Sequence, residues 1–134
     1  MELLELYQLA DENNISVYSF DLPQTLSMSV RETDGSCAIA IDPFELDSTK
    51  DEMIRLAHEL GHCVTGSFYN RYSDLDIREK SEFSADKWAI KKLIPKDELQ
   101  IAFKQGYTEP WDLAEYFNVT EEFVIKAFNY YKNQ

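Results

Sequence analysis

The pattern of apolar and polar positions divides the first part of the chain into one helix and three strands. Apolar residues recur at helical spacing over residues 2–13, which predicts an N-terminal helix. Residues 16–20, 26–31 and 37–41 are short and either apolar or alternating, as strands are. Asp34-Gly35 is a hairpin signal between the last two of these segments. A small sheet with one tight connection is therefore expected.

Two long helices are predicted in the middle of the chain. Thr49 and Glu52 match a capping box with Thr49 as the N-cap, and apolar residues then recur at helical spacing up to Gly66. A second helix is predicted over residues 73–93. Gly61 lies inside the first helix, where a glycine costs about 1 kcal/mol relative to alanine. Either the glycine is simply tolerated there, or it allows another backbone or a substrate to approach closely.

The rest of the chain is predicted to form three shorter helices, over residues 96–104, 109–117 and 120–131. The segment that joins the last two resembles the first half of a helix-turn-helix. Ala114 would pack between the helices, Asn118 would take the left-handed turn position, and Thr120 would cap the final helix. This helix begins with Glu121-Glu122, whose carboxylates would repel DNA phosphates. We therefore expect this region to pack on the rest of the protein or to hold a partner protein, and not to bind DNA.

Together these elements predict an α+β fold in two parts. Residues 1–95 are expected to contain the N-terminal helix, a three-stranded, mostly antiparallel sheet and the two long helices. Residues 96–134 are expected to form a C-terminal helical region packed on that domain. The 134 residues are 44% hydrophobic and 13% aromatic, which is enough to bury a core.

The charge of the chain limits its partners. Its formal net charge is -12 at pH 7. Binding to nucleic acid in general needs cationic surface that displaces counterions, so no direct nucleic-acid contact is expected. The acidic surface either serves solubility alone or attracts a basic partner through long-range electrostatics.

Location and redox chemistry are also constrained. No segment is apolar for long enough to span a bilayer, and residues 1–14 have neither the positive charge nor the apolar run of a signal peptide. A cytoplasmic protein without membrane contact is expected. Cys37 and Cys63 do not make a disulfide framework. Cys37 is interpreted as a strand residue, and Cys63 as a small buried helix residue without a metal or redox role.

The candidate chemistry lies in the string His58-Glu59-Leu60-Gly61-His62, which contains the only two histidines of the chain. Residues four apart lie on the same face of a helix, so His58 and His62 can offer two imidazole nitrogens to one metal ion. Glu59 could reach a water molecule at that metal but is not placed to be the third ligand. Two nitrogen ligands beside a carboxylate base are what a zinc hydrolase needs.

A third protein ligand is expected from the second long helix. Glu82 is the first choice, because a two-histidine zinc site needs another ligand and the chain has no third histidine. Glu79 is the alternative. Asp86 is interpreted either as the hydrogen-bond acceptor for the far nitrogen of a ligand histidine or as a surface acid. Ala85 and Ala89 share a side of this helix and would let it pack tightly against the motif helix.

The paired motif resembles one known family. HExxH followed by residues 82–89 (Glu-Phe-Ser-Ala-Asp-Lys-Trp-Ala) and Leu93-Ile94-Pro95 is similar to the ImmA/IrrE family of small metallopeptidases, which are thermolysin-like gluzincins. The resemblance covers residues 15–95 well and the remainder loosely. It implies a gluzincin-like fold and one Zn²⁺ ion with three protein ligands, namely His58, His62 and Glu82. Asp86 would then be the acid that orients a ligand histidine.

The resemblance also implies an activity and a substrate class. The implied substrate is a DNA-binding repressor, often encoded beside the peptidase on a phage or integrative element, and its cleavage would relieve repression. Glu59 would be the general base and would pass its proton to the leaving nitrogen. Many gluzincins stabilise the oxyanion with a further histidine, which this chain lacks.

Two structural expectations follow for such a peptidase. Tyr72, in the loop between the two long helices, is the candidate for stabilising the oxyanion, and the alternative is that it is only a packing residue. The strand over residues 37–41 is the candidate edge for an extended substrate, unless both of its edges are paired.

Two other functions compete with a peptidase. One is a catalytically silent, zinc-stabilised binding module that acts as an anti-repressor. The other is a toxin component that cleaves or binds a cellular target. Zinc with an open, water-bearing position favours the enzyme, whereas a fourth protein ligand favours the binding module.

Overall fold

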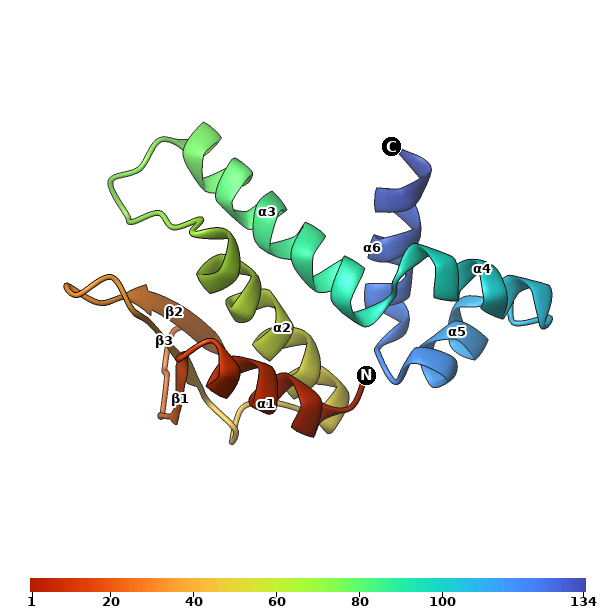
Figure 1. Ribbon diagram of the computed structural model, residues 1–134, viewed down its shortest axis with the longest axis horizontal. Helices are drawn as coiled ribbons and strands as arrows, with labels where there is room; N and C mark the ends of the chain where they lie inside the picture. The colour runs from red at the N-terminus through yellow and green to blue at the C-terminus, as the bar shows by residue number, and fades with distance from the viewer.

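Six helices and one three-stranded sheet make up the fold, and the computed structural model describes residues 1–134. The elements in chain order are α1 (Leu3–Glu12), β1 (Ser16–Ser19), β2 (Ser27–Arg31), β3 (Cys37–Ile41), α2 (Thr49–Thr65), α3 (Leu75–Leu93), α4 (Lys96–Lys104), α5 (Pro110–Phe117) and α6 (Glu121–Lys132). The expected α+β class is confirmed. Figure 1 shows the sheet at one end of the molecule and the three C-terminal helices at the other.

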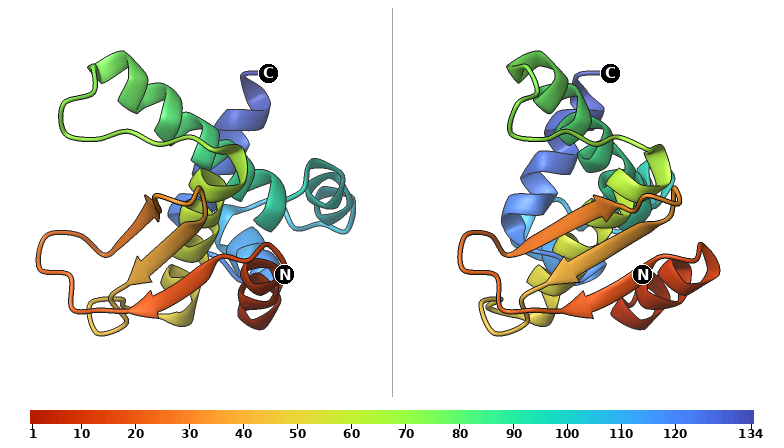
Figure 2. Two further views of the ribbon diagram at one scale, coloured as in Figure 1. Left: turned by 60° about the vertical axis from the view of Figure 1, so that its left-hand side comes forward. Right: turned by 90° about the vertical axis from the view of Figure 1, so that its left-hand side faces the viewer.

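The sheet has the order β1-β3-β2, so β3 is its central strand (Figure 2). β2 and β3 are antiparallel, whereas β1 and β3 are parallel, which makes the sheet mixed. The expectation that residues 37–41 offer a free edge is therefore wrong. The hairpin places β2 on one side of β3, and β1 takes the other side. The free edges belong to β1 and β2.

Local signals explain the hairpin between β2 and β3. Gly35 adopts a φ of +90°, which a residue with a side chain rarely takes. The Asp34 carboxylate accepts a hydrogen bond of 2.9 Å from the backbone N–H of Ser36. On the central strand β3, Ile39 and Ile41 are buried, whereas Tyr18 on the edge strand β1 is half exposed.

Helix α2 covers the sheet, and α3 packs along α2 (Figure 1). A Cβ atom at Gly61 would lie only 2.6 Å from the carbonyl oxygen of Ala85, so the two backbones touch at this point. Ala85 and Ala89 are fully buried. Of the two explanations for Gly61, close approach of another backbone is therefore the correct one.

The start of α2 differs from the predicted capping box. The N-cap is Ser48, not Thr49, and the Ser48 hydroxyl accepts a hydrogen bond from the backbone N–H of Asp51. The Glu52 side chain does not reach back, because it accepts a hydrogen bond of 2.7 Å from the Tyr7 hydroxyl of α1. The cap of α2 therefore comes from Ser48 alone, and Glu52 instead links α2 to α1.

The turn between α5 and α6 forms as predicted. Ala114 is buried between the helices, Asn118 adopts a left-handed φ of 57°, and the Thr120 hydroxyl accepts a hydrogen bond from the backbone N–H of Phe123. One core runs from α1 through α2 and α3 into this region. At its far end the Tyr131 hydroxyl donates a hydrogen bond of 2.7 Å to the carbonyl of Ile94.

A disulfide joins Cys37 of β3 to Cys63 of α2, with a Cα–Cα distance of 5.8 Å. The prediction that Cys37 and Cys63 serve only as a strand residue and a small buried helix residue, without a disulfide, is wrong. The two cysteines are 26 residues apart in sequence, and only the packing of α2 on the sheet brings them together.

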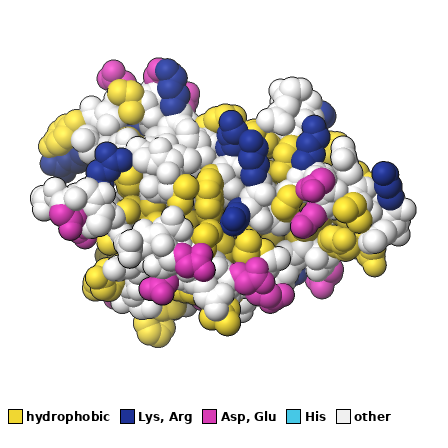
Figure 3. All heavy atoms as spheres, viewed as in Figure 1, with side chains coloured by type: hydrophobic (Ala, Val, Ile, Leu, Met, Phe, Trp, Pro, Cys, Tyr) yellow, Lys and Arg dark blue, Asp and Glu magenta, His cyan; other side chains and the backbone are white.

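The surface carries both signs of charge despite the net negative charge. Figure 3 shows acidic and basic side chains interspersed on one face, with apolar side chains between them. Among the helices, none has both the length and the apolar character that crossing a membrane requires.

Candidate metal centre

Three side chains converge from the two long helices. His58 and His62 lie one turn apart on α2, and Glu82 faces them from α3, so that one ligand atom from each lies within 4.8 Å of the others. The Glu82 carboxylate oxygens are 2.9 Å from Nε2 of His58 and 3.2 Å from Nε2 of His62. Glu79 is exposed and is not part of this group. The close contact at Gly61 is what brings α3 near enough for Glu82 to reach α2.

The far nitrogens of both imidazoles have acceptors of their own. Nδ1 of His58 is 2.9 Å from a carboxylate oxygen of Asp86, and Nδ1 of His62 is 2.7 Å from the backbone carbonyl of Ser67. With these acceptors, a neutral ring would carry its hydrogen on Nδ1 and would present the lone pair of Nε2 to a metal. Both Nε2 atoms lie within 3.2 Å of the Glu82 carboxylate, where they can share a proton or a bound cation with it. Two imidazole nitrogens and a carboxylate are a donor set that suits Zn²⁺.

The pKa values of this cluster reflect its negative surroundings. Burial alone would lower the pKa of His58, but its hydrogen bond to Asp86 and the nearby acids Glu59 and Glu82 raise it. Burial alone would raise the pKa of Asp86, but hydrogen bonds with His58 and Lys126 lower it. The site therefore stabilises positive charge at the point where the three side chains meet.

Glu59 is buried beside the two histidines and is held by the sheet. The Ser27 hydroxyl of β2 donates a hydrogen bond of 2.7 Å to one Glu59 carboxylate oxygen. Ser27 itself is buried. Glu59 therefore has one oxygen fixed, and its side chain lines the same cavity as His58 and His62.

A cavity of about 440 Å³ opens in front of these residues, between β2, α2 and the loop that follows α2. Its lining includes Thr25, Ser27, Met28, Ser29, Arg55, His58, Glu59, His62, Phe68, Tyr69 and Glu82. A second cavity of about 360 Å³ shares Arg55, His58 and Glu82 with the first and extends to the first turns of α6. The two form a cleft that passes the converging side chains, with β2 at one end and α6 at the other.

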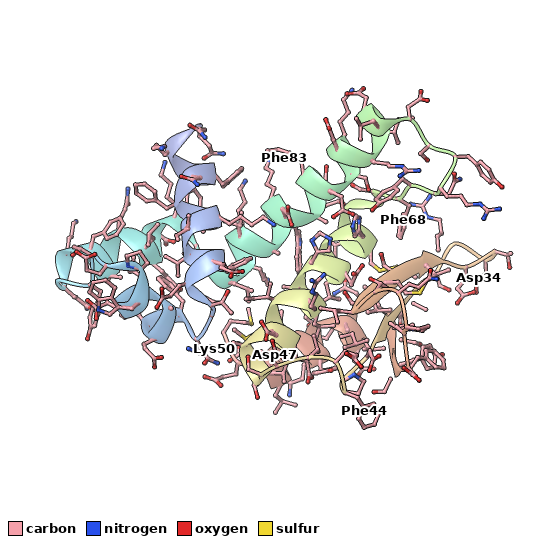
Figure 4. All side chains as sticks on the ribbon, turned by 180° about the vertical axis from the view of Figure 1, so that it is seen from behind. Asp34, Phe44, Asp47, Lys50, Phe68 and Phe83 are labelled. Carbon is pink, nitrogen blue, oxygen red and sulfur yellow. A yellow bond between two sulfur atoms is a disulfide. The ribbon has the colours of Figure 1, made fainter.

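The loop between α2 and α3 contributes Tyr69, not Tyr72, to the cleft. The Tyr69 hydroxyl donates a hydrogen bond of 2.8 Å to Glu82, and this bond together with burial raises the pKa of Tyr69 to about 12. Tyr72 is 79% exposed and accepts a hydrogen bond from Arg71. The structure does not bring Tyr72 to the cavity. Phe68, labelled in Figure 4, lies under the Arg31 guanidinium of β2 and anchors this loop to the sheet.

Several residues of the site were not singled out from the sequence. Ser27 lies on an alternating strand, and nothing in that pattern indicates a bond to Glu59. Ser67 acts through its backbone carbonyl, which any residue could supply. Lys126 of α6 lies 2.9 Å from Asp86, although the two belong to different predicted parts of the chain. Tyr69 lies in the same loop as the predicted Tyr72, but of the two only the Tyr69 side chain lines the cavity.

The fold and the site together define a metallopeptidase-like protein, in which an HExxH helix and an acid from the next helix surround one point beside a sheet edge. The family model described as the IrrE N-terminal-like domain, Peptidase_M78, matches residues 10–129, and the chain belongs to this family. This confirms the ImmA/IrrE resemblance and supports a metallopeptidase type of function in general. No curated protein and no solved structure matches the chain.

Proposed function

We propose that the protein is a zinc-dependent endopeptidase that cleaves a regulatory protein. His58, His62 and Glu82 would hold one Zn²⁺ ion, and Asp86 would orient His58. The observation that carries the proposal is the convergence of these three side chains beside a buried, oriented Glu59 in an open cleft. When bound, zinc would polarise the scissile carbonyl and lower the pKa of a water molecule.

Glu59 is the proposed general base. Its fixed carboxylate can take a proton from the attacking water and give it to the leaving nitrogen. The hydrogen bond from Ser27 leaves its other oxygen free for this transfer. Because Ser27 belongs to β2, the strand that borders the cleft also orients the Glu59 carboxylate.

Tyr69 replaces Tyr72 in the proposed oxyanion role. Its hydroxyl lies in the cleft and donates to Glu82, and once Glu82 binds the metal this O–H would turn to the developing negative charge. The free edge of β2 lies beside the same cavity, since Ser27, Met28 and Ser29 line it. An extended substrate added to this edge would pass the metal centre.

The proposed substrate is a DNA-binding repressor of a phage or mobile element, met in the cytoplasm. The family supplies the peptidase class, and the net charge of -12 suits a basic partner. The protein itself would touch neither nucleic acid nor membrane. If electrostatic attraction matters, the association rate should fall steeply with added salt.

The test is intact-mass spectrometry of a repressor encoded beside the gene, co-expressed with the wild type or with Glu59→Gln. The wild type should yield two fragments, and Glu59→Gln should bind zinc normally but cut at least roughly a thousandfold more slowly. Glu79→Gln, which changes an exposed acid of α3, is the matched control and should cut at the wild-type rate. Native-rate cutting by Glu59→Gln would contradict the assignment of the base. Repressor binding without cutting by the zinc-loaded wild type would favour the catalytically silent binding module.

A further inference from the structure

Lys126 connects the C-terminal helices to the candidate metal centre. Its ammonium group lies 2.9 Å from one carboxylate oxygen of Asp86, while the other oxygen of Asp86 is 2.9 Å from Nδ1 of His58. Lys126 belongs to α6, Asp86 to α3 and His58 to α2, so three helices meet in one hydrogen-bonded chain. Figure 1 shows α6 beside the second half of α3.

We propose that Lys126 is a positioning residue, which orients His58 for metal binding by holding Asp86. The inference rests on the proposed function, because it takes the His58, His62 and Glu82 cluster to be a zinc site. It makes the C-terminal helical region a part of the metal centre and not only a support for it.

The physical basis is the number of bonds that fix the Asp86 carboxylate. A carboxylate held through one oxygen can rotate about its side-chain torsions, and the imidazole bonded to it then rotates too. With both oxygens occupied, the carboxylate plane is set and so is the direction of the His58 lone pair. The Asp86 side chain is only 25% exposed, so solvent competes less for these bonds than it would at the surface.

A second ion pair joins the same two parts of the chain and provides a control. Lys50 of α2 lies 3.2 Å from Glu115 of α5, where the glutamate side chain is 83% exposed. Neither residue contacts the histidines or Glu82. Replacing Lys50 by Met removes the same charge and the same type of contact as replacing Lys126 by Met, but away from the metal centre.

Long-range electrostatics and positioning predict opposite changes in zinc affinity when Lys126 is lost. A lysine near a bound cation repels it, so the loss of that charge alone would tighten zinc binding. This repulsion acts directly between Lys126 and the ion and does not depend on Asp86. Positioning acts only through Asp86 and weakens binding when Lys126 is lost. The direction of the change and its dependence on Asp86 therefore separate the two effects.

The experiment is a zinc titration of the metal-free full chain against a chelating indicator, for the wild type, Lys126→Met and Lys50→Met. The wild type should bind one zinc per chain; a wild type that binds none would overturn the proposed function and, with it, the inference. Lys126→Met should bind zinc roughly three- to tenfold more weakly, somewhat less than the loss of a direct partner of a ligand. Lys50→Met should match the wild type. Unchanged or tighter binding by Lys126→Met would overturn the inference.

A double-mutant cycle gives the decisive control. In an Asp86→Asn background, Lys126 has no carboxylate to hold, so adding Lys126→Met should change zinc affinity by less than about twofold. If Lys126→Met weakens binding by the same factor in both backgrounds, its effect does not pass through Asp86 and the inference is wrong. Because the Lys126 side chain is 51% exposed, we expect Lys126→Met to fold like the wild type.

Discussion

The helix pairs α2–α3 and α5–α6 are built in different ways. The α5–α6 pair is joined by a short turn with Asn118 in a left-handed conformation and Val119 fully buried. The α2–α3 pair is joined by a long loop, and the two backbones approach closely at Gly61 and Ala85. Apolar side chains fill the first interface, whereas the second carries a polar cluster.

The difference shows how a metal site can be placed between helices. Large side chains at Gly61 or Ala85 would keep α2 and α3 apart and would leave Glu82 out of reach of the histidines. The α5–α6 pair has no such requirement, because nothing between its helices needs to converge on a point. We expect changes in α2–α3 to affect metal binding, and changes in α5–α6 away from Lys126 to affect stability alone.

The largest effect is expected at the third ligand. Glu82→Ala removes one of three ligands and should weaken zinc binding by roughly a thousandfold, more than the 10- to 100-fold typical of a residue that only supports a ligand. Glu79→Ala, one turn earlier on the same helix, should leave the affinity unchanged. Metal titration of both variants checks this, and the reverse order would move the ligand to Glu79.

The second effect concerns the covalent link between α2 and the sheet. The Cys37–Cys63 disulfide closes a loop of 26 residues, and its loss should lower the free energy of unfolding by about 3 kcal/mol through greater chain entropy in the unfolded state. Urea unfolding with and without reductant measures this. A Cys37→Ser and Cys63→Ser double variant should be insensitive to reductant. Equal stability of the wild type in both conditions would show that the bond contributes nothing.

The third effect tests the contact between α2 and α3. Gly61→Ala should destabilise the protein by about 2 kcal/mol, because the new methyl group meets the Ala85 backbone and outweighs the gain in helix propensity. It should also weaken zinc binding, since α3 must move away. Lys91→Ala, at an exposed position of α3, is the control. A more stable Gly61→Ala protein would contradict the close approach of the backbones.

The smallest effect tests the other pair. Asn118→Ala places a less suitable residue in the left-handed position and should cost about 1 kcal/mol of stability. Asn118→Gly relieves that strain and should be at least as stable as Asn118→Ala. Zinc affinity should stay at the wild-type value in both. Thermal unfolding and metal titration together check the contrast with Gly61→Ala. A loss of zinc affinity in Asn118→Ala would contradict the expectation that the α5–α6 pair affects stability alone.

Sequence patterns predicted the parts of the structure that depend on neighbouring residues. The hairpin at Asp34-Gly35 and the turn at Asn118 are set by local backbone preferences, and both form as expected. The HExxH motif is also local, because one helical turn brings His58 and His62 onto the same face. These features need no knowledge of which elements pack together.

The features that the sequence did not reveal depend on packing between distant segments. The disulfide requires α2 to lie on β3, and the central place of β3 depends on where β1 pairs. Lys126 reaches Asp86 only because α6 docks beside α3. No periodicity or spacing carries this information, whereas small residues such as Gly61 and Ala85 gave a partial signal for one contact.

The central claim is that His58, His62 and Glu82 hold one divalent cation with a position left open for water. Anomalous diffraction at the zinc edge, from a crystal grown with zinc, tests it most directly. We predict one peak at roughly 2 Å from Nε2 of both histidines and from a Glu82 oxygen, with a non-protein ligand completing the coordination. The absence of a peak between these side chains would contradict the claim, and a fourth protein ligand there would contradict the open position.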